Sequence, residues 1–226
     1  MSWTIEFPPG FNPVYASTLG DDDETWYKLY SRLRNAVIAL STKGIILLCA
    51  TSDKGRNETS RNAPVYPGAF GFRNQDILTI GAASSTFGPP YTPVHFIFPG
   101  ENVPLERDLG GETSGSSVAT ATASGMAASI LALVDMVCRE DEKCEQNKWD
   151  ERVVPRDKIT TAMIAKAFES LGGSPTVVLD VIRLKEIYKM LYNSETEEGK
   201  LPCGGLAIIK TLLRDLHLVY HPLLAY

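Results

Sequence analysis

Gly115-Ser116-Ser117-Val118-Ala119-Thr120-Ala121-Thr122-Ala123-Ser124-Gly125 is a run of small residues in which a polar loop gives way to a helix-like segment. At such a helix entry the first backbone N–H groups have no partner inside the helix, and the side chains of the first turn are exposed. The segments before this run are typical of strands, and those after it of helices. The run is therefore predicted to join a sheet to the helices that cover it.

Three apolar runs before this junction predict the sheet. They occupy residues 45–49, 77–83 and 94–98. Continuous apolar runs of this length are typical of strands that are buried on both faces in a parallel sheet. A shorter β-like run, residues 2–7, ends at Pro8-Pro9, which cannot continue a strand ladder. The predicted class is α/β, with a parallel sheet flanked by helices.

A helix is predicted between the first two of these four strands. Asp21-Asp22-Asp23-Glu24 places negative charge where a helix N-terminus is stabilised by it, so we interpret the run as a cap and not as a metal site. Gly44 is expected to end the helix. Strand, helix and strand would then form a β-α-β unit. The apolar residues of the helix recur at three- and four-residue steps and predict one buried stripe: Leu29, Leu33, Ala36, Val37 and Leu40.

Helices are predicted after the junction. The first spans residues 118–137 and is followed by a charged connector at residues 139–156. Asp157 is expected to cap a second helix, and residues 177–191 and 206–220 are the third and fourth. We expect a domain at residues 1–172 and a helical C-terminal extension at residues 173–226. The predicted buried stripe of the second helix is Ile159, Met163, Ile164, Ala167, Phe168 and Leu171.

Charge and cysteine content narrow the class of protein. The formal net charge is −5, and Lys and Arg are scattered through the helices, so we expect no nucleic-acid partner. The cysteines lack C-x-x-C spacing and are too sparse for a disulfide scaffold, so a reducing compartment and a single bridge both fit. The four are Cys49, Cys138, Cys144 and Cys203.

The sequence as written predicts a cytoplasmic protein. Its first ten residues lack the basic and long apolar regions of a signal peptide. Residues 113–134 are uncharged and long enough to span a bilayer, which leaves a membrane helix as an alternative. Because the first half of this run is mostly Gly, Ser, Thr and Ala, and Asp135 follows it, we favour a packed helix and expect no membrane partner.

The order of these segments resembles the subtilisin-like serine peptidases (subtilases) over about residues 1–172. Their nucleophile motif, G-T-S-M-A-[TS]-P-x-V-A-G, is similar to G-S-S-V-A-T-A-T-A-S-G here. Four further segments resemble family elements in the same order: residues 50–55, 66–68, 80–82 and 98–100. This sequence matches the nucleophile motif at Gly115, Ser117, Ala119, Thr120 and Gly125, and its departures from the motif include Ser116, Val118 and Ala121.

The resemblance implies site residues. Ser117 would be the catalytic nucleophile, and the Ser117 N–H with the loop of Asp53 would bind the oxyanion. Substrate would lie between two segments, Ser2-Trp3-Thr4 and Ala50-Thr51-Ser52, as an added strand. No cofactor is implied, and no ligand cluster suggests a metal. A short motif of small residues also fits a packed helix with capping serines, and only the ordered neighbours favour the nucleophile.

Two departures from the family bear on activity. Asp53 stands where the family has an oxyanion-donating Asn, and an ionised carboxylate accepts hydrogen bonds but donates none. The family's catalytic D-[ST]-G and H-G-T-x-[VA]-A motifs are missing from this sequence, so the domain is expected to be truncated at its N-terminus. None of its three histidines, His95, His217 and His221, is followed by Gly.

Two functions remain open at this point. The first is a serine endopeptidase, a hydrolase whose acid and base are missing from this chain, so that the isolated chain is expected to be inactive. The second is a non-catalytic subtilase-like module that binds peptides or proteins. The partners would be a polypeptide substrate or a peptide ligand, and further domains of a longer protein could accompany it.

Overall fold

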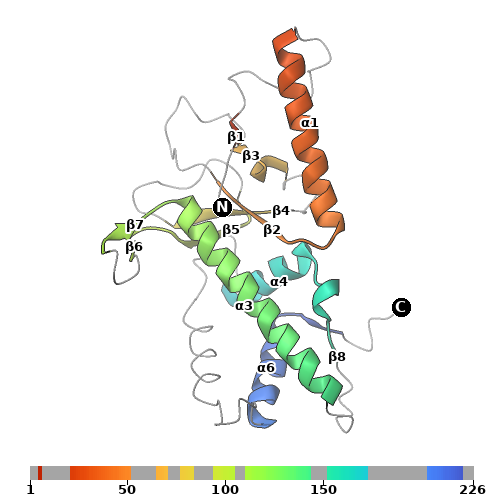
Figure 1. Ribbon diagram of the computed structural model, residues 1–226. Helices are drawn as coiled ribbons and strands as arrows, with labels where there is room; N and C mark the ends of the chain where they lie inside the picture. Colours follow the sequence, from red (N-terminus) through yellow and green to blue (C-terminus); the bar gives the residue numbers. More distant parts are fainter. Residues whose placement is uncertain are drawn as a thin grey trace. The chain divides into compact units, whose positions relative to one another are not determined.

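A computed structural model describes residues 5–6, 21–51, 65–70, 77–83, 94–104, 110–143, 152–172 and 203–220 (Figure 1). The chain divides into two compact units, Met1–Ser124 and Gly125–Tyr226, with the division inside one long helix. The boundary predicted between residues 172 and 173 lies where the described residues stop, and it stays a prediction. The two units are described separately below.

A three-stranded parallel sheet forms the centre of the first unit. Its strands are β2 (Leu47–Ala50), β4 (Ile77–Ala83) and β5 (Phe96–Pro99), in the order β2-β4-β5. The register pairs Leu47 with Ile77 and Ile80 with Phe96. The predicted α/β class is confirmed by these parallel strands and the helices that accompany them. Since the strands run in the same direction, their carboxyl ends meet at one edge of the sheet.

The first predicted strand lies outside this sheet. β1 (Ile5–Glu6) pairs antiparallel with β3 (Val65–Tyr66) in a separate two-stranded ladder. The β-α-β unit predicted from residues 2–49 is therefore wrong, because its first strand joins another partner. A second short ladder, β6 (Val103–Pro104) with β7 (Glu112–Thr113), follows β5.

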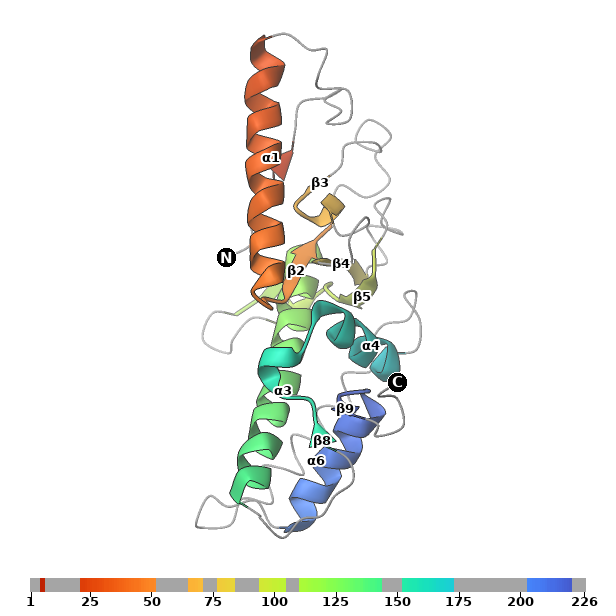
Figure 2. The ribbon, with the colours of Figure 1, turned by 90° about the vertical axis from the view of Figure 1, so that its right-hand side faces the viewer.

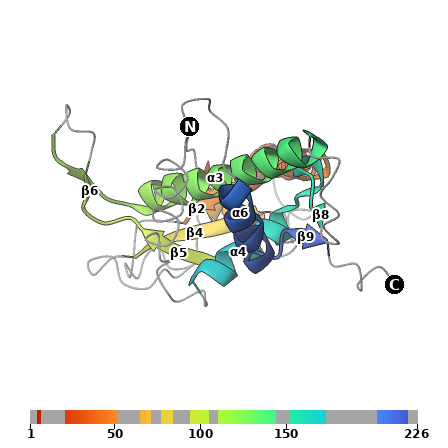
Figure 3. The same ribbon diagram turned by 90° about the horizontal axis from the view of Figure 1, so that it is seen from below.

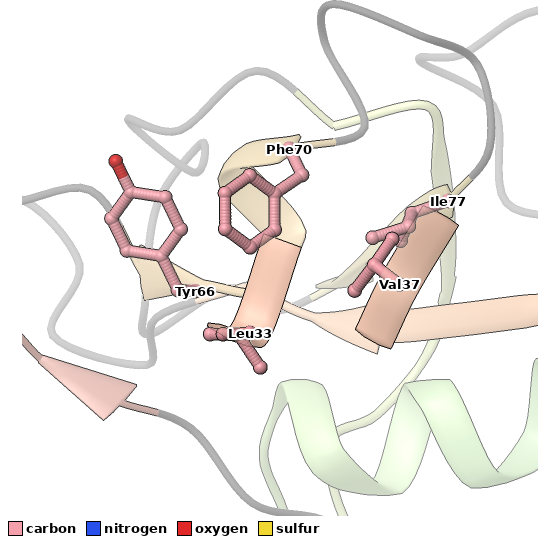
Figure 4. Packing of buried hydrophobic residues seen from close by; sticks show 5 residues of the cluster. All are labelled: Leu33, Val37, Tyr66, Phe70 and Ile77. Atoms are coloured by element: carbon pink, nitrogen blue, oxygen red, sulfur yellow. The ribbon is translucent and has the colours of Figure 1, made fainter. Parts of the chain in front are cut away.

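One face of helix α1 (Asp21–Thr42) packs on a small aromatic cluster (Figure 4). Leu33 and Val37 contribute to this buried cluster, with partly buried Trp26 and Tyr30 against it. The Tyr30 ring lies 5.4 Å from the Tyr66 ring and 5.2 Å from the Phe70 ring, centroid to centroid. Burial of these side chains stabilises the unit by removing apolar surface from water. The cluster is completed by Tyr66, by Phe70 of the 3₁₀ turn η3 (Gly68–Phe70) and by Ile77.

Two burial predictions for this region need correction. Leu29, Ala36 and Leu40 were predicted to be buried with Leu33 and Val37, but they are exposed, because the aromatic cluster covers only part of the helix's apolar surface. The strand run at residues 45–49 was predicted to be buried on both faces. Its Ile45 is exposed, and the side chains at 46–49 are half-buried, since β2 is at one side of the described sheet.

The second unit is helical with one short ladder (Figure 2). It contains α4 (Thr161–Gly172) and α6 (Cys203–Asp215), and its ladder pairs β8 (Arg152–Val153) with β9 (Val219–Tyr220). The predicted stripe of α4 is largely confirmed, with Ile164, Ala167 and Phe168 fully buried. The helix does not begin at Asp157, which lies in the 3₁₀ turn η4 (Arg156–Lys158). Instead, the Thr160 hydroxyl accepts from the Met163 N–H at 3.3 Å.

Helix α3 (Ser116–Lys143) extends past the predicted end at residue 137. Residues 139–143, predicted to belong to a connector, are helical. Within α3, Ser116–Arg139 is the one described helix that is long and apolar enough to cross a membrane by length and composition. The third predicted helix, at 177–191, lies outside the described residues. The fourth ends at Asp215, before Leu216 and Tyr220.

Candidate active site

Glycine follows the carboxyl end of β5 at Gly100 and precedes the start of α3 at Gly115. Figure 3 shows β5 and α3 from below. The Gly115 N–H donates to the Gly100 carbonyl at 2.7 Å. A Cβ placed on Gly100 would lie 2.7 Å from the Gly115 carbonyl oxygen and 2.7 Å from the Ala82 Cβ. Gly115 itself has φ 140°, a conformation that favours glycine. The small residues of the motif therefore bring the helix start against the carboxyl edge of the sheet.

Ser116 links the helix start to the neighbouring strand. Its side chain is 3% exposed, and its hydroxyl donates to the Thr51 carbonyl at 2.5 Å. Thr51 follows β2 directly, and its N–H donates to the Ile80 carbonyl of β4 at 3.0 Å. The Ser116 hydroxyl is thus engaged inside the protein. This role was not predicted, because Ser116 and Thr51 lie 65 residues apart in the chain.

Ser117 lies one residue further, in the first turn of α3, and is exposed. Its hydroxyl makes no hydrogen bond to another residue in the described part of the chain. The Gly115 carbonyl accepts from the N–H groups of Val118 at 3.1 Å and Ala119 at 3.2 Å. The Ser117 N–H is one of the first-turn donors for which the helix has no acceptor of its own. An accessible hydroxyl and a helix-start N–H therefore occur at one residue, as an acyl-transfer nucleophile needs.

The other predicted site residues are only partly described. Ala50 and Thr51 are buried at the end of β2, and Thr51 is brought to the α3 start through Ser116. Asp53 and Ser52 follow Thr51 but lie outside the described residues, as do Ser2, Trp3 and Thr4. The predicted oxyanion and substrate-binding roles of these residues stay predictions.

His95 lies at the opposite end of β5 from Ser117. Its Nδ1 accepts from the Thr79 N–H at 3.0 Å and lies 2.8 Å from the Thr79 hydroxyl. Burial lowers the pKa of His95 from its ordinary value of 6.5, which favours the neutral ring. His95 precedes β5, whereas Gly100, whose carbonyl accepts from the Gly115 N–H, follows it, so an extended strand of about 16 Å lies between the two residues. His95 is a sheet residue.

The remaining candidate groups offer little chemistry. Burial raises the pKa of the Cys49 thiol to about 11, so its reactive thiolate is scarce at neutral pH. His217 lies in the turn after α6 with φ 58°, in the second unit, and His221 is outside the described part of the chain. Among the residues that the structure describes, no cluster of three His, Cys, Asp or Glu side chains could hold a metal ion.

Comparisons with known proteins add no assignment. The chain matches no known protein-family model, and no curated protein sequence matches it.

Proposed function

We propose that the first unit carries the nucleophile half of a subtilisin-like serine endopeptidase site, with Ser117 as the nucleophile. The observation that carries this proposal is the contrast between two adjacent serines. Ser116 is buried and bonded to the Thr51 carbonyl, whereas Ser117 is exposed at the helix start. The ordered sequence elements that resemble the family's motifs support the same assignment.

In this proposal the Ser117 hydroxyl attacks a peptide carbonyl from the start of α3. The tetrahedral oxyanion is stabilised by the Ser117 N–H and by the loop that carries Asp53. Asp53 at that position weakens the oxyanion site, because a carboxylate can donate there only when it is protonated. Losing one such donor costs about 3 kcal/mol of transition-state stabilisation.

Activation of Ser117 needs a general base that the described part of the first unit does not supply. Removing the catalytic histidine of a peptidase of this type lowers turnover on the order of a millionfold. His95 has its Nδ1 bonded by the Thr79 N–H, so we do not assign it this role. We therefore expect the isolated 226-residue chain to have no useful peptidase activity, and we assign Ser117 a positioned but unactivated state.

The assay for this proposal is peptide hydrolysis by the purified chain, followed by mass spectrometry of an unstructured peptide mixture. The expected result is the same product yield for the wild-type chain and Ser117→Ala. Turnover that disappears in Ser117→Ala would show that a base is present, and would refute the unactivated state. Reading the transcript upstream of the Met1 codon for in-frame D-[ST]-G and H-G-T-x-[VA]-A motifs tests the family assignment independently.

The second candidate is a subtilase-like module that binds peptides without cutting them. Asp53 and the missing acid-base motifs favour it over the peptidase. The two candidates separate when a fluorophosphonate probe is applied to the longest natural form of the protein. Labelling at Ser117 together with both upstream motifs supports the peptidase. Absence of both motifs, with no labelling, supports the binding module.

A further inference from the structure

His95 joins the start of β5 to β4 through its ring as well as its backbone. The His95 N–H donates to the Thr79 carbonyl at 2.9 Å, one residue before β5 begins. In the other direction, the Thr79 N–H donates to Nδ1 of the His95 ring at 3.0 Å. Thr79 is buried, so the ring supplies the acceptor that a backbone carbonyl usually supplies to a strand amide. We call these two hydrogen bonds the His95 contact.

The His95 contact requires a neutral ring. A ring nitrogen that accepts a hydrogen bond carries no proton, so the single proton of the neutral ring is on Nε2. A second proton, on Nδ1, would point at the Thr79 N–H, and the hydrogen bond between these two groups would be lost. The Thr79 hydroxyl lies 2.8 Å from Nδ1 and can accept from the charged ring, but it does not give the Thr79 amide a new acceptor. Protonation therefore costs the closed state the partner of a buried amide.

The described elements around the His95 contact carry no charge that would stabilise a protonated ring. β2, β4, β5 and η3 contain one titratable side chain, the Cys49 thiol, whose pKa burial raises to about 11. Residues 116–125 of α3, which lie against β4 at Gly100, contain no charged side chain. Burial also lowers the pKa of His95. Because water stabilises the charged ring better than these neighbours do, protonation favours a state in which the half-buried ring has left β4.

We propose that the His95 contact is an acid-sensitive switch: protonation of Nδ1 releases the start of β5 from β4, while β4 stays paired with β2. The contact is fully present above pH 6.5, the ordinary pKa of histidine, and is lost as the pH falls below it, because the released ring binds its proton more readily than the bonded ring. Pairing of β4 with β2 involves backbone groups that do not titrate, such as the Ile80 carbonyl and the Thr51 N–H at 3.0 Å. This proposal is independent of the peptidase assignment.

Amide hydrogen exchange of the full chain, measured by NMR at two adjacent residues, tests the proposal. The Thr79 N–H bonds to His95, whereas the Ile80 backbone faces β2, so release of the His95 contact exposes the Thr79 amide alone and global unfolding exposes both. Each exchange rate is corrected for its intrinsic pH dependence. The protection of Thr79 relative to Ile80 should then fall roughly 5- to 30-fold between pH 7.5 and 5.0, since a free imidazole gains at most about 30-fold in proton binding over this range. A constant ratio overturns the proposal.

Two variants and the titration of the ring separate His95 from other effects of acid. His95→Asn keeps an acceptor near the position of Nδ1 but does not titrate, so its exchange ratio should change by less than about twofold. His217→Asn, at an exposed histidine of the second unit, should keep the wild-type fall. In the wild-type chain the NMR signals of the His95 ring should shift over the same pH range as the exchange ratio. An equal fall in His95→Asn, or a ring that takes up its proton while Thr79 stays protected, contradicts the switch.

Discussion

Two neighbouring serines have different roles in the candidate site. Ser116 buries its hydroxyl and ties the start of α3 to the Thr51 carbonyl, 65 residues away in sequence. Ser117 is carried one residue further along the first turn, where its side chain is exposed. A helix advances each residue by about 100°, so adjacent side chains must point in different directions. One serine can therefore fix the helix start while the next remains accessible.

Replacing Ser116 by alanine tests this division. Ser116→Ala leaves the buried Thr51 carbonyl without its hydroxyl donor, and we expect a loss of about 1–3 kcal/mol in the free energy of unfolding. Ser116→Thr keeps a hydroxyl and should therefore lose less of the free energy of unfolding than Ser116→Ala. The matched control is Ser124→Ala, since the exposed Ser124 hydroxyl donates to the Thr120 carbonyl of its own helix. Urea denaturation of the three variants measures these differences. Equal stability of Ser116→Ala and wild type would contradict a stabilising bond between Ser116 and Thr51.

His95 predicts a dependence of stability on pH. Burial lowers its pKa below 6.5 in the folded chain, so the unfolded chain binds the proton more readily. The contribution of neutral His95 is fully present above pH 6.5 and is lost as the pH falls from there through the folded pKa. His95→Asn keeps an acceptor near Nδ1 but does not titrate. Urea midpoints between pH 7.5 and 5 should fall less steeply in this variant, and identical slopes would exclude His95 as the source.

At the scale of elements, the junction between β5 and α3 depends on the absence of a side chain at residue 100. A Cβ there would lie 2.7 Å from the Gly115 oxygen and 3.0 Å from the Ala119 Cβ. The Gly115 backbone and the buried Ala119 of α3 cannot shift without disturbing the packing around them. Gly100→Ala is therefore expected to lower the free energy of unfolding by about 1–3 kcal/mol. Gly125→Ala in the same helix meets no atom within 4 Å and should stabilise by about 0.5–1 kcal/mol. Thermal melts of both variants, with shifts of opposite sign, are the expected result.

The elements show what could be predicted from sequence and why the rest could not. The strand at residues 77–83 was predicted with its observed bounds, because a continuous apolar run in the middle of a parallel sheet has a clear pattern. The partner of Ile5–Glu6 was missed, since local pattern does not specify which strand a short segment joins. The stripe of α1 was predicted too wide, because periodicity identifies an apolar face but not how much of it a neighbour covers.

The same limit applies to the site. A serine at a helix start was visible in the sequence, and the structure describes it there at Ser117. The link from Ser116 to Thr51 joins residues far apart in the chain, so no local pattern could show it. The positions of Asp53 and of Ser2, Trp3 and Thr4 stay predictions, because they lie outside the described residues.

At the scale of the whole molecule, the proposed nucleophile position is separate from the groups that would activate it. The helix start and the carboxyl edge of the sheet belong to one unit, Met1–Ser124, which is therefore expected to present Ser117 by itself. The acid and base motifs of the proposed family are missing from this sequence. Such a chain should hold its serine in place without turning over substrate.

Labelling kinetics at Ser117 test this central claim most directly. The 226-residue chain is incubated with a fluorophosphonate probe, and the adducts are mapped by peptide mass spectrometry, with exposed Ser124 in the same helix as the internal reference. We predict that Ser117 reacts no faster than Ser124, because an unactivated hydroxyl is a weak nucleophile. Rapid, stoichiometric labelling of Ser117 alone, abolished by denaturing the chain, would contradict it.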